Sequence, residues 1–162
     1  MVRRPVFSAV LGAVAGILIL ASGCADQGPT AVQLKPAKAI SAGRAYERGA
    51  FNMSVGPSGG TFHLPIGQVV FPVGAVSEET TFTATLDGRT LGIDFQPHIV
   101  FPIAAQPTLM VNLAGVKVDA DVLRFAHVSD DGVVISEYQA LIDNGIASVN
   151  VEGFSRWILA AD

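Results

Sequence analysis

Three histidines are the side chains of this sequence best suited to hold a metal ion or to act as a base. His63, His98 and His127 lie far apart, each in a different expected strand. Zinc sites usually combine closely spaced His and Cys ligands, and no such pair occurs here. We therefore predict no catalytic or metal role for them. His63 and His127 alternate with apolar neighbours, which fits side chains that point to solvent.

Two acidic segments offer oxygen ligands. Carboxylates one residue apart, as in Asp119-Ala120-Asp121, can converge on calcium in a loop, and Asp130-Asp131-Gly132 offers a second such pair. Neither segment has the regular ligand series of an EF-hand. Asp and Gly are also typical turn residues, so we expect turn and edge-strand roles. No metal or other cofactor is predicted.

Aromatic side chains near the end of the chain raise the possibility of a carbohydrate platform. Trp157, Phe154 and Tyr138 are the candidates. Aromatic residues make up only 7% of the chain, and Trp157 lies in an apolar closing segment, so core packing is the favoured interpretation. A carbohydrate or metal site on loops at one end of the domain stays the alternative function.

The first 23 residues have the three parts of a secretory signal peptide. Arg3 and Arg4 form a basic start, residues 5–20 are uncharged and mostly apolar, and Ala21-Ser22-Gly23 provides small residues at a cleavage site. An uncleaved membrane anchor and ordinary secretion remain alternatives. Because the segment is rich in Ala and Gly, however, it is a weak stop-transfer helix.

The sole cysteine follows these small residues directly. The sequence ending in Cys24 resembles the lipobox of bacterial lipoproteins, in which this cysteine receives a diacylglycerol thioether and becomes the acylated N-terminus. The resemblance implies lipid attachment at Cys24 and a location at the cell envelope, facing the periplasm or the cell exterior. Ala25, rather than Asp, follows the cysteine, which slightly favours the outer membrane.

Charge excludes one class of partner. The chain has 10 Lys and Arg against 14 Asp and Glu. Loss of Arg3 and Arg4 with the signal peptide leaves 8 basic residues and a formal net charge of −6. An acidic surface argues against nucleic acid as a partner.

The composition divides the mature chain into two parts. Residues 24–50 contain Gly and Pro among small and polar residues, with few large apolar side chains, and are expected to form a flexible tether. Residues 51–162 are long enough for one domain with one core. With a single cysteine there is no intrachain disulfide, so packing must stabilise this domain.

Alternation of apolar and polar residues begins at residue 51. Phe51, Met53 and Val55 alternate with Asn52 and Ser54, as in a half-buried strand. Thr81, Thr83 and Thr85 are expected to face outward in the same way from a strand at 82–86. The other strands are expected at 61–64, 90–95, 99–101, 108–113, 122–128, 133–141, 146–151 and 154–160.

Turn sequences separate several of these strands. Gly follows Asp or Asn at 87–88, 130–132 and 143–145, between pairs of expected strands. Short strands at this spacing, without an amphipathic helix, predict an all-β fold, either a sandwich or a barrel.

One family shares several of these features. Gly59-Gly60-Thr61-Phe62, the turn Pro72-Val73-Gly74-Ala75 and the closing segment 153–160 resemble the ZU-five domain of zonula occludens proteins, netrin receptors and ankyrins. Residues 95–101 and 107–111 are similar to its middle segment. The resemblance covers about residues 51–162 and implies an antiparallel β-sandwich. It also implies a non-catalytic structural or protein-interaction module, whose partner here would be an envelope or extracellular protein.

Some relatives of this domain cleave their own chain before the serine of a His-Phe-Ser sequence, with the histidine as base. Here Gly153 precedes Phe154-Ser155, so the local base is missing. We therefore expect Ser155 to be an outward-facing strand residue and predict that the protein is not an enzyme.

Overall fold

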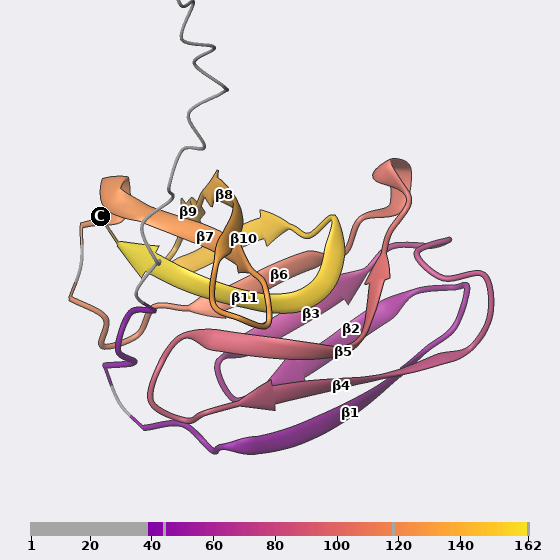
Figure 1. Ribbon diagram of the computed structural model, residues 1–162, viewed down its shortest axis with the longest axis horizontal. Helices are drawn as coiled ribbons and strands as arrows, with labels where there is room; N and C mark the ends of the chain where they lie inside the picture. Colours follow the sequence, from indigo (N-terminus) through magenta and orange to yellow (C-terminus); the bar gives the residue numbers. More distant parts are fainter. Residues whose placement is uncertain (1–38, 44, 118, 162) are drawn as a thin grey trace, which may run out of the picture. The chain divides into compact units, whose positions relative to one another are not determined.

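Two antiparallel β-sheets pack against each other in the computed structural model, which describes residues 39–43, 45–117 and 119–161 (Figure 1). The expected all-β sandwich is confirmed. The signal peptide predicted at 1–23, the lipid-attachment residue Cys24 and tether residues 25–38 lie outside the described residues. Within the described ranges, no helix has the length and apolar character needed to span a membrane.

The larger sheet has six strands in the order β1-β4-β5-β11-β7-β8, and every neighbouring pair is antiparallel. The strands are β1 (Gly49–Val55), β4 (Thr80–Leu86), β5 (Gly92–Val100), β11 (Gly153–Ala161), β7 (Leu123–Val128) and β8 (Val134–Gln139).

The smaller sheet has five strands in the order β2-β3-β6-β10-β9, again antiparallel throughout. They are β2 (Gly60–Leu64), β3 (Gly67–Phe71), β6 (Thr108–Asn112), β10 (Ile146–Asn150) and β9 (Leu141–Asp143). Two single-turn 3₁₀ helices, η1 (Ile103–Ala105) and η2 (Ala120–Val122), lie in the connections.

The core lies between the sheets and follows from the period-two pattern. In β4, Phe82 and Ala84 are fully buried while the intervening threonines face outward, as expected. Five phenylalanines gather at the centre of the core, with ring centroids 4.2–6.2 Å apart: Phe71, Phe82, Phe95, Phe101 and Phe154. No polar or charged side chain among the described residues is buried.

The stretch 133–141, expected as one strand, divides between the two sheets. β8 belongs to the six-stranded sheet and ends at Gln139, whereas β9 begins at Leu141 in the five-stranded sheet. Between them, Ala140 is buried and its N–H donates to Leu123 O at 3.2 Å. The apolar pattern continues across this residue because it is inside the core, so the pattern alone gives no sign of the change of sheet.

The segment before β1 is attached to the domain, which corrects part of the expected tether. Ile40 N donates to Leu159 O at 2.8 Å and Leu91 N donates to Ile40 O at 2.9 Å. Ile40 also packs against the core, so residues 39–41 join the sheet between β11 and the start of β5. The domain therefore begins at least twelve residues before the predicted boundary at 51.

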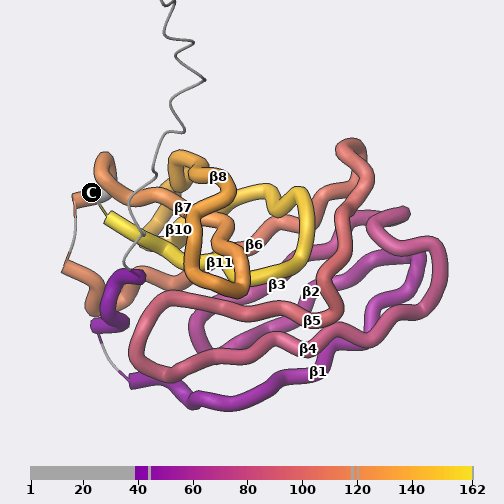
Figure 2. Tube along the Cα trace, viewed as in Figure 1, coloured from indigo at the N-terminus to yellow at the C-terminus, as the bar shows by residue number. Residues whose placement is uncertain are grey.

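β11 runs the length of the larger sheet and connects two ends of the domain. Its C-terminal end lies beside residues 39–41, and its N-terminal end lies beside the last residues of β5 (Figures 1 and 2). The connection after β5, which contains η1, extends from that second end.

Candidate functional site

The pairing of β5 with β11 is irregular, and the candidate site lies beside this irregularity. β11 pairs with β5 at Phe154↔Ile99 and again at Arg156↔Asp94. Between these pairs β11 supplies only Ser155, whereas β5 supplies the four residues 95–98. Pro97 lies in this stretch and has no N–H for the ladder, so regular pairing is interrupted there. The ladder between β5 and β11 is consequently irregular at this point.

Beside this irregularity, at one end of the sandwich, lies a pocket of about 390 Å³. Residues 98–100 of β5 form one side, residues 152–155 at the start of β11 form the other, and His127 of β7 completes the lining. The wall is mainly apolar, and its polar groups come from the two histidines, Glu152 and Ser155. We call it the β5–β11 pocket.

His127 faces the inside of the sandwich and not the solvent, contrary to the expectation from its apolar neighbours. Its ring stacks on Trp157, with centroids 5.0 Å apart and planes 5° apart. Its Nδ1 lies 3.7 Å from Glu152 Oε1, and the side chain is only 15% exposed. The reason is register: His127 is opposite Trp157, so both side chains lie on the core face of adjacent strands.

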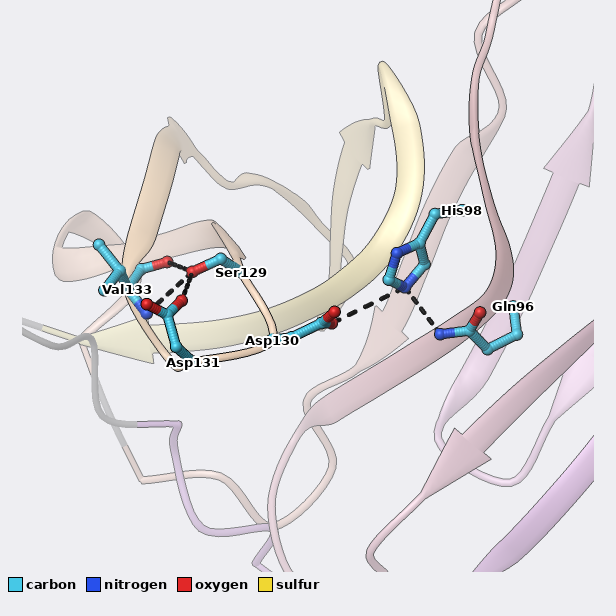
Figure 3. Close-up of polar contacts among 6 residues, drawn as sticks. All are labelled: Gln96, His98, Ser129, Asp130, Asp131 and Val133. Carbon is cyan, nitrogen blue, oxygen red and sulfur yellow. Dashed lines mark hydrogen bonds and ion pairs between the residues drawn. The ribbon is translucent and has the colours of Figure 1, made fainter.

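His98 lies on the opposite side of the pocket and contacts two elements. Its Nε2 is 2.7 Å from Gln96 Nε2 and 4.0 Å from Asp130 Oδ1 (Figure 3). In the contact with the Gln96 amide, the donor and acceptor roles depend on the imidazole tautomer. His98 thus connects β5 to the tip of the β7–β8 hairpin.

That hairpin tip is built by the acidic segment predicted to be a turn. Ser129 N donates to Val133 O at 2.9 Å, and the Ser129 hydroxyl hydrogen-bonds to Asp131 (Figure 3). Gly132 has φ +83°, which a residue with a side chain rarely adopts. The Asp131 carboxylate is therefore hydrogen-bonded within the turn, while the neighbouring Asp130 points toward His98.

Burial lowers the pKa of His127 below its ordinary value of 6.5, and the Glu152 carboxylate opposes this effect without reversing it. The folded protein therefore holds His127 neutral at pH values where an unfolded chain would protonate it. Since the unfolded state then binds more protons, stability falls as the pH drops below about 6.5 toward the folded-state pKa.

A His127→Gln variant tests this linkage. We expect acidification from about pH 7.5 to pH 5 to lower its free energy of unfolding less than that of the wild type, because no buried imidazole must then be protonated on unfolding. Urea unfolding at the two pH values measures the difference. His63→Gln, which changes an exposed histidine of β2, should keep the wild-type pH dependence. Equal pH dependence in all three proteins would contradict the assignment.

Ser155 differs from the expected outward-facing strand residue. Its Oγ is buried and has no hydrogen-bond partner, as is also true of His127 Nδ1. Both residues line the β5–β11 pocket. In the described part of the chain, three buried side-chain atoms have no hydrogen-bond partner: Ser155 Oγ, His127 Nδ1 and Asp94 Oδ1.

Three other candidates, His63, Asp119 and Asp121, do not line this pocket. His63 lies exposed on β2 of the smaller sheet. Asp119 and Asp121 flank the start of η2, where the Asp121 carbonyl accepts a hydrogen bond from Arg124 at 3.0 Å. Trp157 is 1% exposed and donates its indole N–H to Gly153 O at 3.0 Å, which confirms core packing.

The carboxylates and imidazoles do not converge as ligands. Among the described residues, no group of three or more His, Cys, Asp or Glu side chains is placed to hold a metal ion. The pairing of His98 and His127 across one pocket was not visible in the sequence, because their proximity depends on strand order and on the interruption in β5.

No family model matches this sequence, and no curated protein matches it either.

Proposed function

We propose that the protein is a lipid-anchored, extracytoplasmic β-sandwich lipoprotein that acts as a non-catalytic protein-interaction or structural module of the cell envelope. The N-terminal signal features and the position of Cys24 support the anchor. Several acyl chains together attach a protein stably to a membrane. Ala25 after the cysteine favours the outer membrane, with the domain facing the periplasm or the exterior.

Exposed apolar side chains carry the interaction part of the proposal. Val100, the last residue of β5, is 86% exposed, and Ile103, the first residue of η1 in the connection that follows, is 90% exposed. Large apolar side chains gathered on one surface are typical of protein-interaction sites. Val100 itself lines the β5–β11 pocket, and Ile103 follows three residues later in the chain.

The surroundings of Ser155 support a non-catalytic role. A serine nucleophile needs a base within hydrogen-bond reach. His98 and His127 line the same pocket, yet Ser155 Oγ makes no hydrogen bond to either of them. The carbohydrate alternative has less support, because Trp157 and Phe154 are buried and offer no exposed ring to stack on a sugar.

Affinity capture tests the interaction. The full-length mature protein, immobilised in detergent, is expected to retain an envelope protein from solubilised membranes. The double variant Val100→Ser/Ile103→Ser should lose most of this retention, because it removes the exposed apolar contact surface. Leu141→Ser is the matched control, since Leu141 is 70% exposed on β9 of the other sheet.

Two outcomes would contradict the proposal. In the first, the double variant retains the captured protein as well as the control does. In the second, the wild type captures no protein, while glycans or calcium bind to it instead, which would favour the alternative function.

A further inference from the structure

The β5–β11 pocket presents a carboxylate that the fold leaves about half exposed. Glu152 is 47% exposed, and its carboxylate has long contacts of 3.4 Å to Ser136 Oγ and 3.7 Å to His127 Nδ1. The buried atoms His127 Nδ1 and Ser155 Oγ have no hydrogen-bond partner. Both atoms are shielded from the surface, so the half-exposed Glu152 carboxylate is the acceptor that a donor group entering the pocket can reach.

The charge at the pocket selects a cation. Glu152 lines it, and Asp130 lies at its edge, 4.0 Å from the His98 ring. No Lys or Arg is among the residues that line it in the described ranges. An anionic ligand would thus meet one carboxylate directly and a second nearby, without a fixed positive charge to balance them.

Size and wall chemistry restrict the ligand further. About 390 Å³ is near the lower end for ligand pockets, so a group the size of one side chain fits better than an extended molecule. The mainly apolar wall, with Ile99 and Val100 on the β5 side, suits a methylene stem. Of the basic side chains, arginine carries five N–H donors in a planar fork that matches a carboxylate and further acceptors.

We propose that the β5–β11 pocket receives an arginine side chain of the partner protein, with its guanidinium on Glu152 and its stem along Ile99 and Val100. This inference rests on the proposed function, since the exposed Val100 and Ile103 beside the pocket supply the surrounding protein contact. It names the feature by which the partner is recognised: an arginine presented next to apolar residues.

Trp157 provides a direct measurement. It is the sole tryptophan of the chain and stacks on His127 at the pocket wall, so its fluorescence reports occupancy. The test is a titration of the full-length mature protein, in detergent micelles, with N-acetyl-arginine amide and with its uncharged isostere N-acetyl-citrulline amide. The arginine probe should give a saturable fluorescence change, and citrulline should bind at least tenfold more weakly.

Two variants of equal charge locate the site. Glu152→Gln should weaken binding of the arginine probe at least tenfold, whereas Glu137→Gln, which changes an exposed residue of β8, should bind like the wild type. Equal binding of arginine and citrulline by the wild type, absence of saturable binding, or equal binding by both variants would each overturn the inference.

The envelope capture separates this inference from the function on which it rests. Loss of the captured protein with Glu152→Gln, but not with Glu137→Gln, supports both. Capture that persists with Glu152→Gln and is lost with the Val100→Ser/Ile103→Ser variant leaves the proposed function intact and overturns the arginine pocket.

Discussion

Replacing Cys24 by serine is expected to move the protein from the membrane fraction to the soluble fraction. Serine has no thiol for the thioether, so no acyl chain can be attached. Each methylene buried in the bilayer contributes about 0.8 kcal/mol, and several chains are lost at once. Fractionation of cells, with labelled palmitate as a second readout, measures the effect.

Ser22→Ala is the control for this experiment. It keeps a small residue at the expected cleavage site and should leave labelling and membrane partitioning unchanged. Wild-type partitioning of the Cys24→Ser variant would refute the lipid anchor and with it the envelope location.

Truncation of Phe154 should produce the largest loss of stability. Its ring lies among four others, with centroids 4.2 Å from Phe95, 4.8 Å from Phe101, 4.9 Å from Phe82 and 5.6 Å from Phe71. Rings from both sheets surround it, so the cavity left by Phe154→Ala cannot easily collapse. We expect the free energy of unfolding to fall by about 3–5 kcal/mol. Urea unfolding at neutral pH measures it.

Phe62→Ala is the matched control, because Phe62 is only half-buried on the edge strand β2. Among the residues that the structure describes, its one ring contact is with Phe71, at 5.7 Å. It should cost clearly less than Phe154→Ala. The opposite order would show that the phenylalanine cluster is not the centre of the core.

Features encoded by neighbouring residues were predictable from the sequence. The alternation of Phe82 and Ala84 with threonines gave the correct buried face of β4, because side chains in a strand alternate between faces. The turn at Asp87 is equally local: its carboxylate accepts the backbone N–H groups of Arg89 and Thr90 at 2.7 and 2.8 Å. Gly74 has φ +80°, in agreement with the tight turn expected after Pro72.

Features that depend on distant pairing were not predictable. β3 escaped the strand pattern because Val69, Val70 and Phe71 are consecutive apolar residues without alternation. β5 was expected as two pieces on either side of Pro97, yet it is one strand whose pairing with β11 is interrupted near that residue. The pattern shows where a proline falls, but not which strand will lie opposite it.

The residues of the candidate site could not be predicted from the sequence for the same reason. His98, His127 and Glu152 come from three separate parts of the chain, and their convergence requires β11 to lie between β5 and β7. Ser155 looked like a residue of a regular strand, because the sequence of β11 gives no sign of the interruption in its neighbour. A histidine stacked on the sole tryptophan likewise follows from register alone.

The placement of residues 39–41 at one end of β11 and of the pocket at the other has a mechanical consequence. β11 has nine residues, which at roughly 3.3 Å each separate the two points by about 25–30 Å. A pull between an anchor acting through Ala39 and an occupant held at Glu152 would be directed along this strand. Such tension loads the hydrogen bonds between β11 and its neighbours β5 and β7 in shear. In shear, many hydrogen bonds bear the force at the same time, whereas peeling would break them one after another.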